Sequence, residues 1–176
     1  MRVILEDPYE RDLFHPGERE AHRRFGVEAE AREMKGTVND ALSAGNARFI
    51  ASQPFFFLAL QGADGAIHTQ MLACAQTPLG TYPLVAFGDA RCFYFLLNER
   101  EGDVLLAQAH GAGCQAGLVF MGFGHRARLR VNGLLRLANG DALPGFQCPD
   151  GHRLMEVRVE QVYANCGTRV VRLKAA

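Results

Sequence analysis

After about residue 54 the chain consists largely of short segments rich in apolar residues, and this pattern predicts strands. Six segments are rich in the aromatic and β-branched residues that favour strands. They are FFFLALQ (55–61), AIHTQMLA (66–73), CFYFLL (92–97), QAGLVFMG (115–122), RARLRVNGLLRL (126–137) and LMEVRVEQVY (154–163). The first two flank Asp64-Gly65, a strong hairpin signal. Six short strands with few helices predict a mainly β protein, a small antiparallel barrel.

The residues before this region are more polar and predict a helical arm. Pro16 can open a helix that Gly26 ends, with glutamates near its first turn and arginines near its last. A second helix is expected from about Asp40 to Ser52, before Pro54. The segment EGDVLLAQAHGAG (101–113) predicts one more short helix between the third and fourth strands.

Length and composition fit a single domain over residues 1–176, with the helical arm at 1–53 and the barrel at 54–176. The 19 basic and 19 acidic residues cancel, so we expect neither nucleic acid nor a membrane as a partner. The longest apolar run, PFFFLAL, is too short to span a bilayer, and no signal peptide is visible. Five cysteines without paired spacing predict reduced thiols and a cytoplasmic protein.

One predicted strand carries an unusual charge pattern. Arg126, Arg128 and Arg130 occupy every second position, so a strand places them on one face. They could be solvated and pair with glutamates of another strand, such as Glu156 and Glu160. Alternatively, they could bind an anion, because guanidinium groups match phosphate and carboxylate oxygens. Composition alone favours the first interpretation.

Two other motifs are weaker. The stretch HGAGCQA (110–116) has a dinucleotide-binding glycine pattern, but the helix precedes it and the strand follows, the reverse of the required order. His110 and Cys114, and Cys148 and His152, are spaced as pairs without the Cys-x2-Cys spacing typical of zinc sites. We therefore predict no metal site.

Four segments, in this order, resemble the pyridoxamine 5′-phosphate oxidase-like, FMN-binding split-barrel family, in particular its flavin-nucleotide-binding branch. They are FHPGEREAHRRFGV, FFLALQGADGAIHTQ, GHRARLRVNG and VRVEQVYANC, and together they span most of the chain. The resemblance implies a six-stranded antiparallel split barrel that forms a homodimer with FMN at the subunit interface. We also expect a dimer because FFFLAL and CFYFLL are more apolar than one small barrel can enclose.

The resemblance also implies a cofactor site. The implied FMN-binding residues are Thr69, Gln70 and Met71 along a strand for the ring, and Arg126, Arg128 and Arg130 with Arg100 for the phosphate. After its third strand the family usually has basic residues that bind the phosphate. Val104 and Leu105 stand at the matching place in this chain.

Two functions follow. The first is an FMN-binding flavoprotein, an oxidoreductase acting on a small molecule, in which FMN performs the redox step. No catalytic acid or base is assigned, because His68, His110 and His125 are equally unplaced. The alternative is a non-enzymatic dimeric binding module that has lost FMN and binds haem, a deazaflavin or a protein partner. The apolar residues Val104 and Leu105 favour this alternative.

Overall fold

The computed structural model describes residues 14–78, 80–124, 126–139, 142–165 and 170–173. It divides into two compact units, residues 1–37 and 38–176. The predicted helical arm of residues 1–53 is thus divided, because its last helix, α3 (Ala44–Ala51), belongs to the second unit. Among the described residues, no helix has the length and hydrophobicity needed to cross a bilayer.

The first unit contains two short helices, α1 (Pro16–Phe25) and α2 (Glu28–Lys35). The limits of α1 follow from the sequence. The His15 side chain accepts a hydrogen bond from the backbone of Gly17, and the Glu18 carboxylate accepts one from the His15 backbone. Gly26 ends the helix in the left-handed conformation, with φ of 66°.

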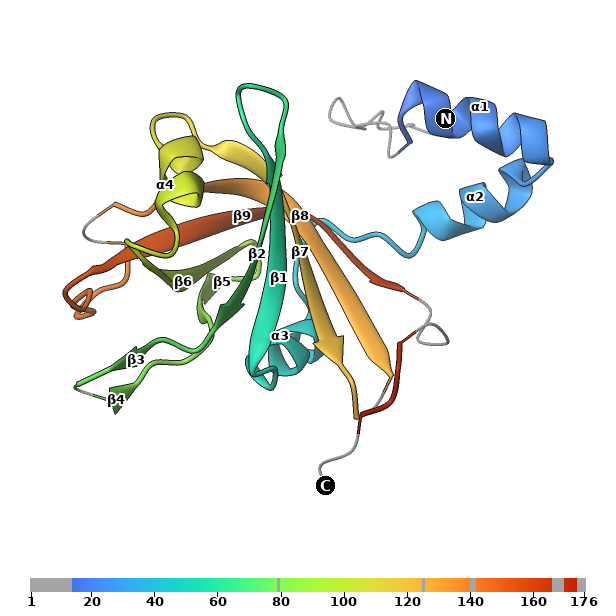
Figure 1. Ribbon diagram of the computed structural model, residues 1–176. Coiled ribbons are helices and arrows are strands. Elements are labelled where there is room, and N and C mark those ends of the chain that lie inside the picture. Colours follow the sequence, from blue (N-terminus) through green and yellow to red (C-terminus); the bar gives the residue numbers. More distant parts are fainter. Residues whose placement is uncertain (1–13, 79, 125, 140–141, 166–169, 174–176) are drawn as a thin grey trace, which may run out of the picture. The chain divides into compact units, whose positions relative to one another are not determined.

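The second unit is built on strands, which confirms the mainly β class. Its elements after α3 are β1 (Phe55–Gln61), β2 (Ile67–Ala73), β3 (Gln76–Thr77), β4 (Gly80–Thr81), β5 (Ala86–Asp89), β6 (Cys92–Asn98), α4 (Asp103–Ala109), β7 (Cys114–Gly122), β8 (Ala127–Leu137) and β9 (His152–Asn165). Seven of the strands form one antiparallel sheet in the order β2-β1-β7-β8-β9-β6-β5, and β3 and β4 form a small separate hairpin (Figure 1). The six predicted strands are all present. The seventh strand of the sheet, β5, is a short edge strand that the sequence pattern did not predict.

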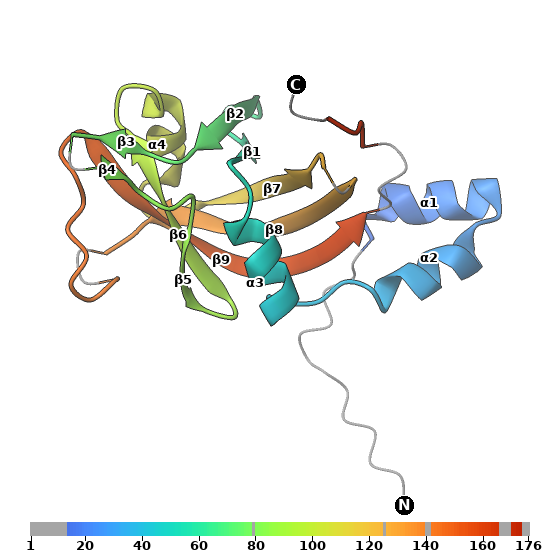
Figure 2. The same cartoon turned by 90° about the horizontal axis from the view of Figure 1, so that it is seen from below.

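The sheet curls so that strands distant in the sheet order share one core. The ring of Phe56 on β1 lies 5.1 Å from that of Phe120 on the neighbouring β7. It also lies 5.2 Å from the ring of Phe95 on β6, four strands away in the sheet order. The strongly bent β9 in Figure 2 follows the same curl. The two edge strands, β2 and β5, do not pair with each other, so the barrel is open, or split.

A glycine allows a close approach between β8 and β9. The register between β8 and β9 shifts at Asn132 and Gly133, where β9 contains one extra residue. A Cβ atom on Gly133 would lie 2.0 Å from the carbonyl oxygen of Arg158. The bulge therefore requires glycine at this position.

Candidate functional site

The register of the sheet defines a row of side chains across four strands. Met71 pairs with Phe57, Phe57 with Val119, and Val119 with Arg130. Directly paired residues project to the same side of an antiparallel sheet. We call this side, which carries Met71, Phe57, Val119, Arg128 and Arg130 and lies opposite the core, the outer face. Phe57 is 40% exposed and Met71 56% exposed, so the row is apolar at one end and cationic at the other.

Next to this row lies a group of phenylalanine rings, the aromatic cluster, made by Phe55, Phe57 and Phe123. The rings of Phe55 and Phe57 are 5.6 Å apart and nearly perpendicular. The Phe55 ring is 6.1 Å from that of Phe123, in the turn after β7. The apolar sequence FFFLALQ does not indicate which of its phenylalanines face away from the core, so Phe55 and Phe57 were not predicted as site residues.

Arg128 and Asn165 continue the outer face beyond the aromatic cluster. Arg128 pairs with Met121 on β7 and with Asn165 on β9. The Nε atom of Arg128 and the Oδ1 atom of Asn165 are both buried, and neither has a hydrogen-bond partner within the described part of the chain. Such atoms lose their hydration without compensation, which costs about 1–3 kcal/mol each. They are therefore candidates for ligand contact.

The arginines of the charged strand are arranged in two ways. Arg128 and Arg130 project from β8 onto the outer face, while Leu129 and Val131 are buried on the opposite side. Arg126 lies in the turn before β8, exposed and with a positive φ of 51°. Two of the three arginines thus share a face of the strand.

One predicted glutamate partner is bonded elsewhere. Glu156 is buried, and its Oε1 atom accepts a hydrogen bond from Nη2 of Arg136 at 2.7 Å. Arg136 and Glu156 are directly paired across β8 and β9. The carboxylate of Glu156 is thus engaged by Arg136, further along β8 than Arg128 and Arg130.

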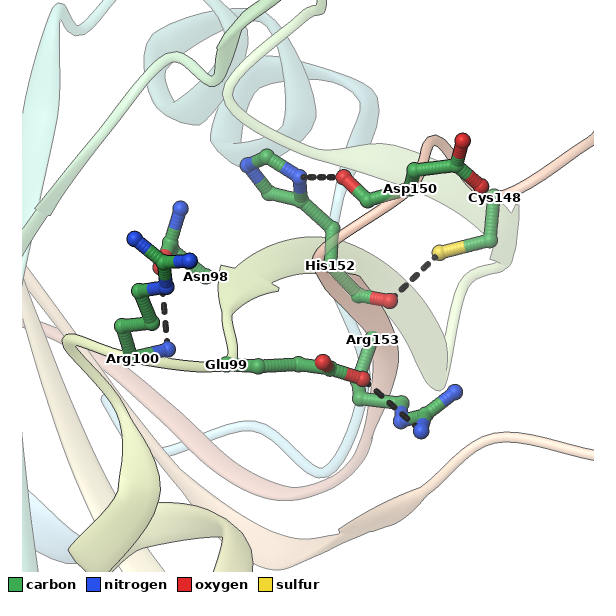
Figure 3. Close-up of polar contacts among 7 residues, drawn as sticks. All are labelled: Asn98, Glu99, Arg100, Cys148, Asp150, His152 and Arg153. Atoms are coloured by element: carbon green, nitrogen blue, oxygen red, sulfur yellow. Dashed lines mark hydrogen bonds and ion pairs between the residues drawn. The ribbon is translucent and has the colours of Figure 1, made fainter.

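Arg100 lies far from the other arginines. It follows β6, whose last residue, Asn98, pairs with His152 at the start of β9, whereas Arg128 pairs with Asn165 at its end. At about 3.3 Å per residue, these ends of β9 are on the order of 40 Å apart along the strand. The backbone N–H of Arg100 donates to the side chain of Asn98 at 3.0 Å, which fixes the turn (Figure 3). Within one chain, Arg100 cannot share a phosphate with Arg128.

A cavity of about 420 Å³ lies between β2 and the start of α4, at the place where the family resemblance predicts a phosphate. Glu101 and Asp103 line it, together with His68 and Gln70, and its described lining contains no lysine or arginine. The side-chain amide of Gln70 donates to the carbonyl oxygen of Glu101 at 3.2 Å. Two carboxylates without a cation repel a phosphate, so this cavity does not fit that group.

A second cavity, of about 520 Å³, is lined by both ends of the long loop between β8 and β9. His110, Cys148 and His152 line it. The Nδ1 atom of His152 is 3.1 Å from the carbonyl oxygen of Asp150, which leaves Nε2 as the acceptor of a neutral ring (Figure 3). The Cys148 thiol donates to the carbonyl oxygen of His152 at 3.3 Å, and burial raises the pKa of this thiol. The cysteine is therefore a neutral thiol near pH 7.

The sequence-predicted site residues are thus divided among three places. Thr69, Met71, Arg128 and Arg130 lie on the outer face, and Arg126 lies in the turn beside it. Gln70 lines the acidic cavity, and Thr69 lines it too, at the margin of the outer face. Arg100 lies in the turn between β6 and α4. The described residues contain no group of three side chains suited to a metal ion.

Comparison with solved structures supports the fold. No protein-family model matches the sequence, and no curated protein matches it. A candidate pyridoxamine 5′-phosphate oxidase from Lactobacillus delbrueckii superposes with a TM-score of 0.51 at 15% identity, covering 71% of this chain and 95% of its own. HupZ from Group A Streptococcus gives a TM-score of 0.52 at 12% identity, covering 76% of this chain and 99% of its own. The chain therefore has the split-barrel fold of pyridoxamine 5′-phosphate oxidase-like proteins, as the sequence resemblance predicted.

Proposed function

We propose that the protein is a homodimeric split-barrel protein that binds a flavin, with FMN as the first candidate, on the outer face of its sheet. The observation that carries the proposal is the shared face of Thr69, Met71, Arg128 and Arg130, which brings the predicted ring-binding and phosphate-binding side chains together. They span four neighbouring strands, about 14 Å at the usual strand spacing.

The side chains of the outer face offer the kinds of contact that a flavin ring can use. Phe57 and Met71 offer exposed apolar surface for the benzenoid part of the ring. Aromatic side chains favour offset stacking or edge-to-face contact with a planar ring. Beside the aromatic cluster, the buried and unpaired Nε of Arg128 offers a hydrogen bond to a polar ring atom.

The contacts that the same face offers to the phosphate are weaker than those it offers to the ring. Arg130 is exposed in the row of Met71 and Phe57, and Arg126 is exposed in the adjoining turn. Both can approach a phosphate, but exposed charge-assisted bonds lie at the weak end of their range of about 1.5–3 kcal/mol. We therefore expect the ring to supply most of the affinity.

The outer face also supports the dimer. Ile67 on β2, paired with Gln61 of β1, is 65% exposed, which extends the apolar surface of Phe57 and Met71. CFYFLL does not contribute, contrary to the sequence expectation, because β6 is enclosed in the chain's own core. A second copy covering this surface would form an interface of the obligate type, above about 2,000 Å² in total.

The dimer can be tested by sedimentation velocity over a range of protein concentrations. We expect a dimer that resists dilution, and we expect Ile67→Glu to convert it to monomer because the new carboxylate would be desolvated in the interface. Thr77→Glu, on the separate β3-β4 hairpin, is the control. A wild-type protein that sediments as a monomer at all concentrations would refute the dimer.

A bound FMN supplies hydride and single-electron chemistry, and the protein supplies its position and electrostatic environment. In this chain, Arg128 would hold the ring and Arg130 the phosphate. Calorimetric titration with FMN and riboflavin tests the proposal. We expect saturation at one flavin per chain for both ligands, with FMN somewhat tighter. Absence of binding of either flavin would refute it.

The second cavity favours one alternative function, a haem-binding module. Two of its lining residues, His110 and His152, are histidines, a side-chain type that holds haem iron as an axial ligand. The Asp150 carbonyl bonded to His152 resembles the outer partners that orient ligating histidines. A haemin titration that gives a sharp Soret band, lost in His152→Ala, would support this function. An unchanged spectrum in that variant would exclude His152 as a ligand.

A further inference from the structure

Two buried polar atoms of opposite character lie side by side on the outer face. The Nε–H of Arg128 is a donor and the Oδ1 of Asn165 is an acceptor, and these residues are directly paired across β8 and β9. They are not bonded to each other, and no other described residue satisfies them. The other strand neighbour of Arg128 is Met121, whose thioether has no proton to donate and accepts only weakly.

The position of Asn165 explains why the sheet itself does not satisfy it. On its second edge, β9 pairs with β6 only from His152 to Arg158. Beyond that stretch, the described backbone contacts on this edge are a hydrogen bond from Val159 to Arg91 and an isolated bridge between Val162 and Asn39. Asn165 therefore lies at the open end of the sheet, at the margin of the outer face, and a ligand that bonds its buried Oδ1 atom must displace the groups that cover it.

We propose that Arg128 and Asn165 recognise the edge of a cyclic imide, in which a ring N–H lies next to a carbonyl oxygen. The carbonyl oxygen would accept from Nε of Arg128, and the ring N–H would donate to Oδ1 of Asn165. The amide nitrogen of Asn165 would donate to the second carbonyl oxygen, as it can in any bidentate amide contact. The pyrimidinedione edge of a flavin has this order of acceptor, donor and acceptor.

The same two atoms discriminate against a simple anion. A phosphate dianion or a carboxylate would satisfy Arg128 but would place an acceptor against the acceptor oxygen of Asn165. The neighbouring aromatic cluster adds a surface against which a planar ring packs. Arg128, which the family resemblance placed at the phosphate, is thus assigned to the ring, and Arg130 remains for the phosphate.

This inference rests on the proposed function in one respect, because it takes the cyclic imide to be part of a flavin ring. The test compares lumiflavin, which has neither ribityl chain nor phosphate, with 3-methyllumiflavin, which lacks the ring N–H. Binding is measured by flavin fluorescence with the full-length protein. In the wild type, methylation should lower affinity about tenfold or more, because it removes one hydrogen bond and leaves a buried acceptor unpaired.

Asn165→Leu should bind lumiflavin about tenfold more weakly and should no longer distinguish the two ligands. Asn132→Leu is the matched control, because Asn132 lies on the same face but already donates to Gln161 at 2.9 Å. This control should keep the discrimination. Equal affinity of the wild type for lumiflavin and 3-methyllumiflavin would overturn the inference while leaving flavin binding intact.

A stability measurement separates ligand recognition from a structural role. Because Asn165 has an unsatisfied buried oxygen, Asn165→Leu should leave the thermal midpoint of the ligand-free protein unchanged or raise it. A clear fall in the midpoint would show that Asn165 is structural, and would count against the inference.

If no flavin binds, a second pair of ligands tests the imide contact. The same variants are then titrated with 1-methyluracil and 1,3-dimethyluracil, which differ only at the imide N–H. Binding of the first alone, lost in Asn165→Leu, would support the inference although the proposed function had failed. Binding of neither uracil would overturn both.

Discussion

Replacement of Arg130 by alanine separates the phosphate of FMN from its ring. Arg130 is exposed on β8, in one row with Phe57 and Met71. Its guanidinium can therefore contact the phosphate of a flavin whose ring lies over the aromatic cluster. An exposed charge-assisted bond contributes about 1.5 kcal/mol, the low end of its range, because water and salt screen it.

That energy predicts an approximately tenfold loss of FMN affinity in Arg130→Ala and little change in riboflavin affinity. Calorimetry at low salt measures both constants. The FMN affinity of the wild type should also fall as salt increases, and the variant should show a weaker salt dependence. Arg158→Ala, which removes an exposed arginine of β9, is the control. Equal weakening of both flavins, or no change in FMN affinity, would show that Arg130 does not bind the phosphate.

Three further predictions concern the fold. Arg136→Met should lower the free energy of unfolding in urea by about 2–3 kcal/mol, because it leaves the buried Glu156 carboxylate unpaired. The effect is limited because Arg136 is itself one-third exposed, so that water screens the ion pair. No change would mean that Glu156 finds another partner. Gly133→Ala should destabilise the protein by at least about 1–3 kcal/mol, because the new Cβ atom would overlap the Arg158 carbonyl oxygen. Gly124→Ala is the control and should not destabilise the protein, because there is open space around Gly124. Equal stability of the two variants would contradict the bulge. Burial raises the pKa of the Cys92 and Cys114 thiols above 9.0, and a hydrogen bond with Cys92 raises the pKa of Tyr94 from 10.0 to about 12. These groups lose protons more readily in the unfolded chain, so the free energy of unfolding should be constant below about pH 9 and fall as the pH rises toward 12. Cys114→Ala should show a shallower fall. A rise in the free energy of unfolding over this range would contradict the assignment.

Much of the fold could be predicted from the sequence because its strands have strong local patterns. The strand predicted from FFFLALQ has the bounds of β1, since an unbroken run of aromatic and aliphatic residues ends at a Gly-Ala-Asp-Gly turn. The helix α2 was not predicted individually, because its N-cap, Val27, makes no side-chain cap. The strand β5 was missed because its four residues include Gly88 and Asp89, which are uncommon in strands.

The candidate site was predictable only in part. Alternation alone placed Arg128 and Arg130 on one face of their strand. It could not place Met71 and Phe57 beside them, because the row depends on pairing between strands that are distant in the sequence. The separation of Arg100 from Arg128 likewise depends on pairing between strands. The end of β6, before Arg100, pairs with the start of β9, and the start of β8, which carries Arg128, pairs with the end of β9.

Methionine methyl NMR tests most directly whether a flavin binds the outer face. The chain has five methionines, and the structure places Met71 and Met121 on this face, while Met155 is fully buried in the core. Individual Met→Leu substitutions assign the signals. On addition of FMN, the ring currents of the flavin should shift the methyl signals of Met71 and Met121 and leave that of Met155 in place. Shifts that spare Met71 and Met121, or a spectrum that does not change, would contradict the account.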